Sequence, residues 1–355
     1  AMIMTLYSRR YYAAPTVEYG HSFGIKSREA LENARSVVAR AINAEPSELI
    51  FTSGQTESNN IAIVGYMKAQ KAGKIATTRI EHESILNVCK AMGDVDYVKV
   101  DGEGFVDMES LESILEKRPA MLSLQHANHE IGTVQDIKRI GKICKRYNVA
   151  LHVDATQSFM KECLDVKAMG IDMLTITPHL IHGPRGVGAL YIRRGIRIKP
   201  IMHGGYNEFG LRPGLENIPA IIGFAKAVEI FDKRDVERMK RLRDMLINGL
   251  LKIKNGFLPF YKTFKFRVFL EEFLYSSVNT IFFILLKWQK RKSRITTTKS
   301  GKIHSGFHTS YSIFSRNFSV NSQNCPLEIP CPFHVTLLKS LINSTAGPGK
   351  KISQR

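Results

Sequence analysis

The sequence predicts an α/β fold in which helices cover both faces of a mainly parallel β-sheet. Between about residues 47 and 192, short apolar runs alternate with longer segments whose apolar residues recur every three or four positions. Short, continuous apolar runs are typical of strands buried on both faces, and their alternation with helices is typical of a parallel sheet. The chain has 355 residues, 44% of them hydrophobic, so it is long enough to bury a full core.

The predicted elements follow one another without internal repeats. The strands are predicted over residues 48–53, 74–78, 96–100, 120–127, 149–155, 172–177 and 187–193. The helices are predicted over residues 27–44, 56–73, 82–93, 107–117, 137–148, 216–231 and 235–254. Ser27 is the predicted N-cap of the first helix, because acidic residues and a one-sided apolar pattern follow it.

The composition changes abruptly near residue 254. The net charge is +19, and residues 254–355 hold 16 lysines and arginines against three acidic residues, together with 12 of the 19 phenylalanines. We therefore divide the chain into an atypical N-terminal segment (1–20), a large domain (21–253) and a basic tail rich in Phe and Ser (254–355). Translation in a wrong reading frame gives such a composition, and a frameshift near codon 255 is our hypothesis for the tail.

Neither a membrane span nor a secretory signal is predicted. The most hydrophobic stretch, residues 266–288, is interrupted by Arg267, Glu271 and Glu272, whereas a span needs about 20 apolar residues. The cysteines are odd in number and scattered, which fits a reducing cytoplasm better than a disulfide framework. They are Cys89, Cys144, Cys163, Cys325 and Cys331, of which we expect the first three to be small buried or half-buried hydrophobes.

Polar residues gather where predicted strands end, which is where α/β sheets bind ligands. Gly54 and Thr56 lie between a strand and a helix, an arrangement that binds phosphate but is also an ordinary helix cap. His82 and His129 each follow a strand, and each taken alone is an ordinary loop or core histidine. Asp154 ends an apolar strand, where burial of a carboxylate is costly without a partner.

Six segments together resemble one enzyme family. They read FTSGQTESNN (51–60), EHESI (81–85), HANHEIGTVQDI (126–137), LHVDATQS (151–158), GPRGVGALYIR (183–193) and GLRPGLENIPAIIGFAKAVE (210–229). Their order and spacing are similar to those of the class V aminotransferase superfamily, and in particular of cysteine desulfurases of the NifS/IscS type. The resemblance covers roughly residues 20–253.

The resemblance implies a pyridoxal 5′-phosphate (PLP) enzyme of the type I transferase fold that works as a homodimer. The implied reaction converts L-cysteine to L-alanine and delivers sulfur for Fe–S cluster assembly, on an Fe–S scaffold protein, or for thiolation. Asp154 matches the carboxylate that pairs with the protonated ring nitrogen, His82 the imidazole that stacks on the ring, and Gln157 the side chain that reaches the phenolic oxygen. The other implied cofactor-binding residues are Gln55, Thr56, His129, Thr177 and His179.

The largest departure from the family is at Leu180, which occupies the position of the Schiff-base lysine. Leucine has no amine, so the resemblance implies that PLP, if bound, is held without a covalent bond. Arg185 is no substitute, because a guanidinium stays protonated and is a poor nucleophile. His82 is then the remaining candidate for a proton shuttle.

Other positions of the family are also altered. His129 replaces the second of two asparagines, and Leu215 replaces the threonine that reaches across the dimer to the phosphate. Neither the loop with the persulfide-forming cysteine nor the arginine that binds the substrate carboxylate is found after residue 254, where the family's small domain is not recognisable. Cys325 and Cys331 are weak candidates for a relocated sulfur acceptor or, with His334, for a metal site, and we predict no metal site.

Three functions compete on the sequence alone. The first is a cysteine desulfurase, and the second is a catalytically impaired PLP-binding protein, an Fe–S assembly scaffold, or the product of a degenerate gene. The third is nucleic-acid binding by the tail, which we do not favour because a charge run is usually a solvated surface. Its candidate residues are Lys287, Trp288, Lys290, Arg291, Lys292 and Arg294.

Overall fold

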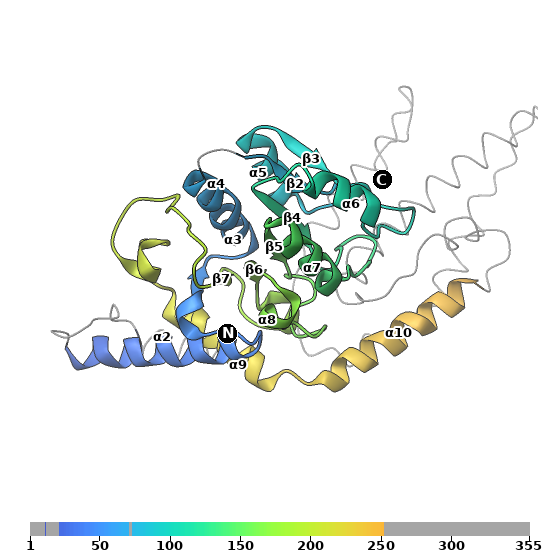
Figure 1. The fold of residues 1–355 in the computed structure, drawn as a ribbon. Coiled ribbons are helices and arrows are strands. Elements are labelled where there is room, and N and C mark those ends of the chain that lie inside the picture. The colour runs from blue at the N-terminus through green and yellow to red at the C-terminus, as the bar shows by residue number, and fades with distance from the viewer. Residues whose placement is uncertain (1–10, 12–20, 71–72, 252–355) are drawn as a thin grey trace, which may run out of the picture. The chain divides into compact units, whose positions relative to one another are not determined.

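The computed structural model describes residue 11 and residues 21–70 and 73–251 (Figure 1). Most of the N-terminal segment and the whole of the basic tail therefore lie outside the described residues. The frameshift hypothesis, the two tail cysteines and the basic cluster beside Trp288 stay predictions. No helix in the described part of the chain is long and apolar enough to cross a membrane.

A seven-stranded sheet forms the centre of the described structure, and all seven strands lie where the sequence predicts them. They are β1 (Leu49–Thr52), β2 (Ile75–Thr77), β3 (Val95–Tyr97), β4 (Met121–Gln125), β5 (Ala150–Asp154), β6 (Met173–Ile176) and β7 (Gly188–Ile192). Their order is β1-β7-β6-β5-β4-β2-β3. Only β7 runs antiparallel to its neighbours, so β1 points in the same direction as the other five strands.

Helices pack on both faces of the sheet, as predicted, because alternate residues of each strand point to opposite faces. On one face, Ile50 and Leu190 pack with residues of the π-helical turn Ile61–Gly65, which follows α3 (Gln55–Asn60), and with residues of α5 (Glu83–Met92). A short helix α4 (Tyr66–Ala69) continues from the π-helical turn.

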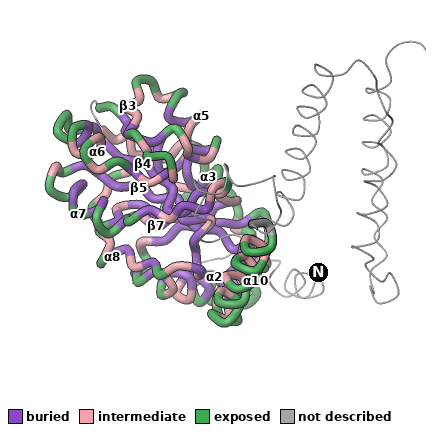
Figure 2. Tube along the Cα trace, turned by 90° about the vertical axis from the view of Figure 1, so that its right-hand side faces the viewer, coloured by how far each residue is buried: buried purple, intermediate pink, exposed green. Residues whose placement is uncertain are grey.

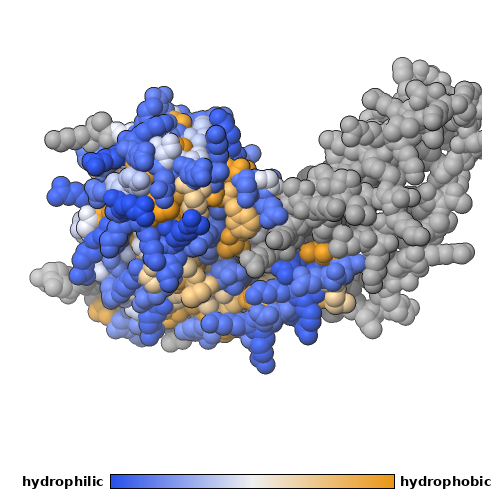
Figure 3. All heavy atoms as spheres, turned by 45° about the vertical axis from the view of Figure 1, so that its right-hand side comes forward, coloured by the Kyte–Doolittle hydropathy of each residue, from blue (hydrophilic) through white to orange (hydrophobic). Residues whose placement is uncertain are grey.

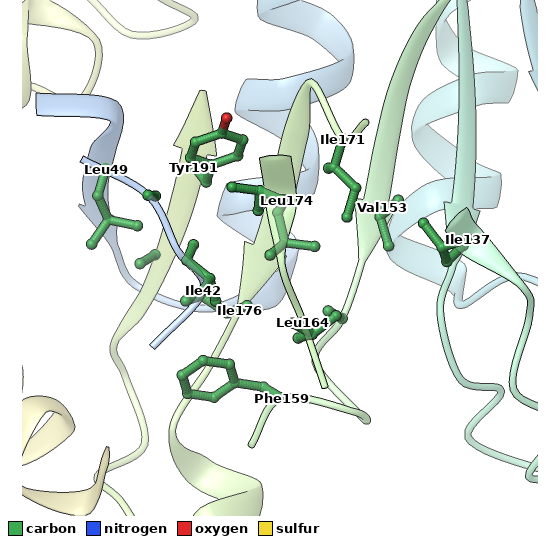
Figure 4. Packing of buried hydrophobic residues seen from close by; sticks show 14 of the residues in the cluster. Ile42, Leu49, Ile137, Val153, Phe159, Leu164, Ile171, Leu174, Ile176 and Tyr191 are labelled. Carbon is green, nitrogen blue, oxygen red and sulfur yellow. The ribbon is translucent and has the colours of Figure 1, made fainter. Parts of the chain in front are cut away.

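The opposite face is covered by five helices, which enclose the larger apolar cluster drawn in Figure 4. They are α2 (Ser22–Arg40), α6 (Met108–Leu115), α7 (Ile137–Tyr147), α8 (Val166–Met169) and α9 (Ile218–Ile230). Phe51 of β1 meets Phe224 of α9 edge-on on this face, with ring centroids 6.4 Å apart.

The last described helix, α10 (Lys233–Leu251), differs from the others in its exposure. Figure 2 shows it largely exposed, whereas the strands are buried. The face drawn in Figure 3 is mostly hydrophilic, with hydrophobic side chains exposed only in small areas.

Two details of the sequence analysis were wrong. Ser27 is not an N-cap, because α2 begins five residues earlier, where His21 Nδ1 accepts a hydrogen bond from Gly24 N at 3.1 Å. Ser27 is instead buried inside the helix. Cys163 is exposed, whereas Cys89 and Cys144 are buried as expected, and burial raises the pKa of both thiols to about 12.

A buried ion pair joins α2 to the segment that follows β7. Arg35 of α2 donates to both carboxylate oxygens of Glu208, at 2.7 and 2.8 Å, and to Leu49 O at 2.8 Å. Glu208 also accepts a hydrogen bond from Phe51 N at 2.7 Å. Burial lowers the pKa of Arg35, but the hydrogen bond and charge of Glu208 outweigh it, so Arg35 is protonated.

We expect Glu208→Ala to lower the free energy of unfolding by about 3 to 5 kcal/mol, because Arg35 is then left as a buried, unpaired charge. The matched control is Glu229→Ala, which removes an exposed pair with Lys226 and is expected to cost less than about 1 kcal/mol. Urea unfolding of the full chain measures both. Equal losses for the two variants would contradict the structural role of the buried pair.

Candidate active site

The candidate site lies at the edge of the sheet where the parallel strands end. Because β1, β2, β4, β5 and β6 share one direction, the residues that follow them meet at the same edge. Gly54 joins β1 to α3 with φ of +149°, and the backbone of β7 passes so close that a Cβ on Gly188 would lie 2.7 Å from Gly54 Cα. The chain therefore turns sharply and directs the start of α3 toward β5 and β6.

Asp154 is the buried centre of this edge. It ends β5, is 2% exposed, and points to the face that carries α3. Its Oδ2 accepts hydrogen bonds from Gln55 Nε2 at 2.6 Å and Asn59 Nδ2 at 2.8 Å, and its Oδ1 accepts one from Thr156 N at 3.0 Å. These donors are uncharged amides, and a carboxylate has about four acceptor positions, so one position remains for a further donor.

A chain of hydrogen bonds connects Asp154 with His82. Asn59 also donates to Ser84 Oγ at 2.8 Å, and that hydroxyl lies 2.8 Å from His82 Nδ1. His82 is the N-cap of α5, since its Nδ1 accepts a hydrogen bond from Ser84 N at 3.1 Å. A backbone N–H only donates, so we assign the proton of the neutral imidazole to Nε2, which then acts as a donor.

His129 lies beside His82, with the ring centroids 5.3 Å apart and the rings inclined at 68°. The preceding Asn128 is buried, and its amide donates to Ile80 O at 2.8 Å, while its Oδ1 accepts from the backbone of Glu130 and Ile131. This turn fixes the end of the segment after β4. The structure thus brings two predicted histidines together at the same end of the sheet.

The loop after β6 contains three more of the predicted residues. Thr177 Oγ1 and His179 Nδ1 are 3.0 Å apart and form a hydrogen bond. Leu180 lies in a 3₁₀ turn (His179–Ile181) and is buried, yet it belongs to neither of the two apolar clusters of the core. Its aliphatic side chain therefore occupies a buried position outside the main core.

The remaining residues that the sequence analysis singled out differ in exposure. Gln157 is half-buried on the turn after β5, and Thr56 is exposed in the first turn of α3. Arg185 is exposed, and Leu215 is 71% exposed. Among the described residues, no group of three His, Cys, Asp or Glu side chains is arranged as a metal site.

Sequence reasoning missed the second carboxyl group of the site, Glu81. It is buried and accepts hydrogen bonds from Thr78 Oγ1 and Gln125 N, both at 2.6 Å. Burial, with a smaller contribution from the charge of Asp154, raises the pKa of Glu81 to about 8 against the lowering effect of these hydrogen bonds. Glu81 is therefore mostly protonated at neutral pH. The only sequence signal for Glu81 was its position in the segment EHES, shortly after a predicted strand.

Comparison with known proteins decides the family. The model of the family described as aminotransferase class-V matches residues 2–265. The chain belongs to this family. The class V relatives include cysteine desulfurase IscS 1 of Archaeoglobus fulgidus, which is 45% identical over 247 residues, covering 67% of this chain and 64% of that protein. The chain thus matches less than two thirds of this relative's length.

Solved structures of family members agree with the fold. A NifS-like protein superposes with a TM-score of 0.67 at 35% identity, covering 70% of this chain and 71% of the other. SspA in complex with cysteine gives a TM-score of 0.61 at 36% identity, covering 65% and 68%. The resemblance to cysteine desulfurases of the NifS/IscS type and the type I transferase fold are both confirmed, and these comparisons favour the desulfurase interpretation over a scaffold.

Members of this family depend on PLP, and the residues of this site fit that cofactor. The buried carboxylate of Asp154 can pair with a protonated ring nitrogen, either at the remaining acceptor position of Oδ1 or in place of one of the amide donors to Oδ2. The hydroxyl of Thr156 is buried and makes no hydrogen bond among the described residues, so the site holds a polar group that a ligand can satisfy. The position of the covalent lysine is the exception, because Leu180 offers no amine.

Titration of the buried groups makes the stability of the fold depend on pH, and the direction of the change differs between acidic and neutral pH. Burial lowers the pKa of His126 and His152 to about 4 from 6.5, so stability contributed by their neutral forms is lost as the pH falls from 6.5 to 4. Burial raises the pKa of Glu81 from 4.5 to about 8, so its contribution is lost as the pH rises toward 8. Between pH 6.5 and 8, only the Glu81 effect operates among these three groups.

We therefore expect the free energy of unfolding to fall between pH 6.5 and 8, by at most about 1.4 kcal/mol per pH unit from this group. Glu81→Gln keeps the size of the side chain and is expected to flatten the profile in that window. Denaturant unfolding at several pH values measures the difference between parent and variant. Parallel profiles for the two proteins would refute the assignment of Glu81 as a buried neutral acid.

Proposed function

We propose that residues 21–253 bind PLP at the Asp154 edge of the sheet and use it on L-cysteine, as a cysteine desulfurase. The observation that carries the proposal is the buried carboxylate of Asp154 at the end of β5, which accepts hydrogen bonds from three amides and is joined to His82 through Asn59 and Ser84. The family's dependence on PLP and the cysteine present in the SspA structure support the cofactor and the substrate. The proposed reaction gives L-alanine and transfers sulfur to an acceptor.

Each side chain of the site has a proposed task. Asp154 holds and keeps protonated the nitrogen of the cofactor ring, and PLP, when bound, supplies an electron sink for the bond-breaking step. His82 contacts the ring and, with its proton on Nε2, acts as a proton donor. Thr56 and the start of α3 bind the phosphate together with Thr177 and His179.

Leu180 makes the proposed binding of PLP non-covalent. The affinity then depends on the phosphate contacts and on Asp154 alone. We also propose a homodimer, an Fe–S scaffold protein as sulfur acceptor, and a cytoplasmic location. The scattered cysteines, odd in number, support a reducing compartment.

Asp154→Asn is expected to weaken PLP binding by about tenfold or more, because a charged acceptor for the ring nitrogen is replaced by a neutral one. Asp107→Asn is the matched control, since an exposed asparagine caps helix α6 as well as aspartate does. Equilibrium dialysis of the full chain with PLP measures both affinities. Unchanged binding by Asp154→Asn would exclude Asp154 as the partner of the ring nitrogen.

Leu180→Lys is expected to form a covalent adduct with PLP that the parent chain does not form. Borohydride reduction followed by mass spectrometry of the peptide containing residue 180 detects the adduct. Leu242→Lys, at an exposed position of α10, controls for reaction of any added lysine. Alanine released from L-cysteine is measured in the same samples, and PLP binding without alanine would leave a cofactor-binding protein that is not a desulfurase.

A further inference from the structure

The side chain of Gln55 occupies an unusual place in the site. Gln55 is the first residue of α3, and its amide crosses from the end of β1 to the end of β5. The bond from Gln55 Nε2 to Asp154 Oδ2, at 2.6 Å, is the shortest of the three that Asp154 accepts. A glutamine at this point thus satisfies the carboxylate that the proposed function assigns to the cofactor ring.

The three hydrogen-bond donors to Asp154 differ in how readily a ligand can displace them. The Thr156 donor is a backbone N–H on the turn that follows β5, so it is fixed by the chain. Asn59 is fully buried and is held by a second hydrogen bond to Ser84 Oγ. Gln55 is half-buried, and no second hydrogen bond of its amide is found among the described residues. Gln55 is therefore the donor that a ligand can displace.

Both acceptor positions of Asp154 Oδ2 are in use, by Gln55 and by Asn59. A ring nitrogen that binds this oxygen must remove one of the two donors. Removal of Asn59 would also break its link to Ser84 and leave a buried amide unsatisfied, which is the costlier choice. Removal of Gln55 releases a long side chain toward solvent, where water satisfies its amide.

We propose that the amide of Gln55 is an internal substitute for the cofactor's ring nitrogen on Asp154, and that PLP binding displaces it. This inference rests on the proposed function, because it takes Asp154 as the partner of the ring nitrogen. Gln55 stabilises the charge of Asp154 when no cofactor is bound and competes with the cofactor for the same oxygen. Gln55 is thus a positioning residue that lowers the affinity of a site that already lacks a covalent lysine.

The test compares the affinity of the full chain for two probes. One is PLP, and the other is its carbocyclic analogue, in which C–H replaces the ring nitrogen. Gln55→Ala is expected to bind PLP about tenfold more tightly than the parent, because the competing bond to a charged group is gone. The affinity for the analogue is expected to stay unchanged, since its ring makes no hydrogen bond with Asp154.

Two variants and a control separate the role of Gln55 from general effects on the fold. Gln55→Asn is too short to reach Asp154 and is expected to behave like Gln55→Ala, and it retains a polar side chain if the alanine variant folds poorly. Gln70→Ala, at the end of α4, is the control. Without cofactor, the two Gln55 variants are expected to melt below the parent, and saturating PLP is expected to abolish this difference.

The outcomes distinguish the inference from the proposed function. Tighter PLP binding by both Gln55 variants, absent for the analogue and for Gln70→Ala, supports the displacement. Unchanged or weaker PLP binding by both variants, with a parent that binds PLP, overturns the inference alone and places the ring nitrogen at Asp154 Oδ1 or elsewhere. Failure of the parent and of every variant to bind PLP overturns both.

Discussion

The ion pair between Arg35 and Glu208 is the contact on which the arrangement of the site depends. It fixes α2, the start of β1 and the segment after β7 at one buried point, where Arg35 also lies 5.1 Å from the Phe51 ring. Glu208 and Phe209 both have positive φ, a conformation that non-glycine residues adopt only when their surroundings enforce it. Four strong bonds to Arg35 and the backbone supply that constraint. The end of β1, and hence Gln55, is placed by this contact.

The two buried carboxyl groups of the site differ in charge: Asp154 is ionised, and Glu81 keeps its proton. Asp154 is surrounded by three amide donors, which stabilise a negative charge in the interior. Glu81 receives two hydrogen bonds but is buried beside that charge, so its proton is retained. One acid thus stays available to a cationic ligand because its neighbour is neutral. Two ionised carboxylates in this buried place would repel each other.

Much of the fold and part of the site were predictable from the sequence. The seven strands are short apolar runs, and a run buried on both faces has few alternative conformations, so their positions were predicted correctly. Asp154 was recognisable because a carboxylate at the end of such a run is unusual. Asn59, Ser84 and Glu81 were missed, since their importance comes from contacts between elements distant in sequence. The cap at Ser27 was wrong because His21, a less common capping residue, has that role six residues earlier.

The position of β1 has a consequence for how the chain reaches this structure. β1 is the first described strand, yet it pairs only with β7, the last one, and it lies at the edge of the sheet. During synthesis from the N-terminus, its apolar residues remain without a strand partner until β7 has left the ribosome. Closing a loop over so long a separation is slow, so the pairing of β1 with β7 forms last. The part of the candidate site that follows β1 is therefore completed last as well. The newly made chain therefore carries an unpaired, aggregation-prone strand from the synthesis of β1 until residue 192 has been made.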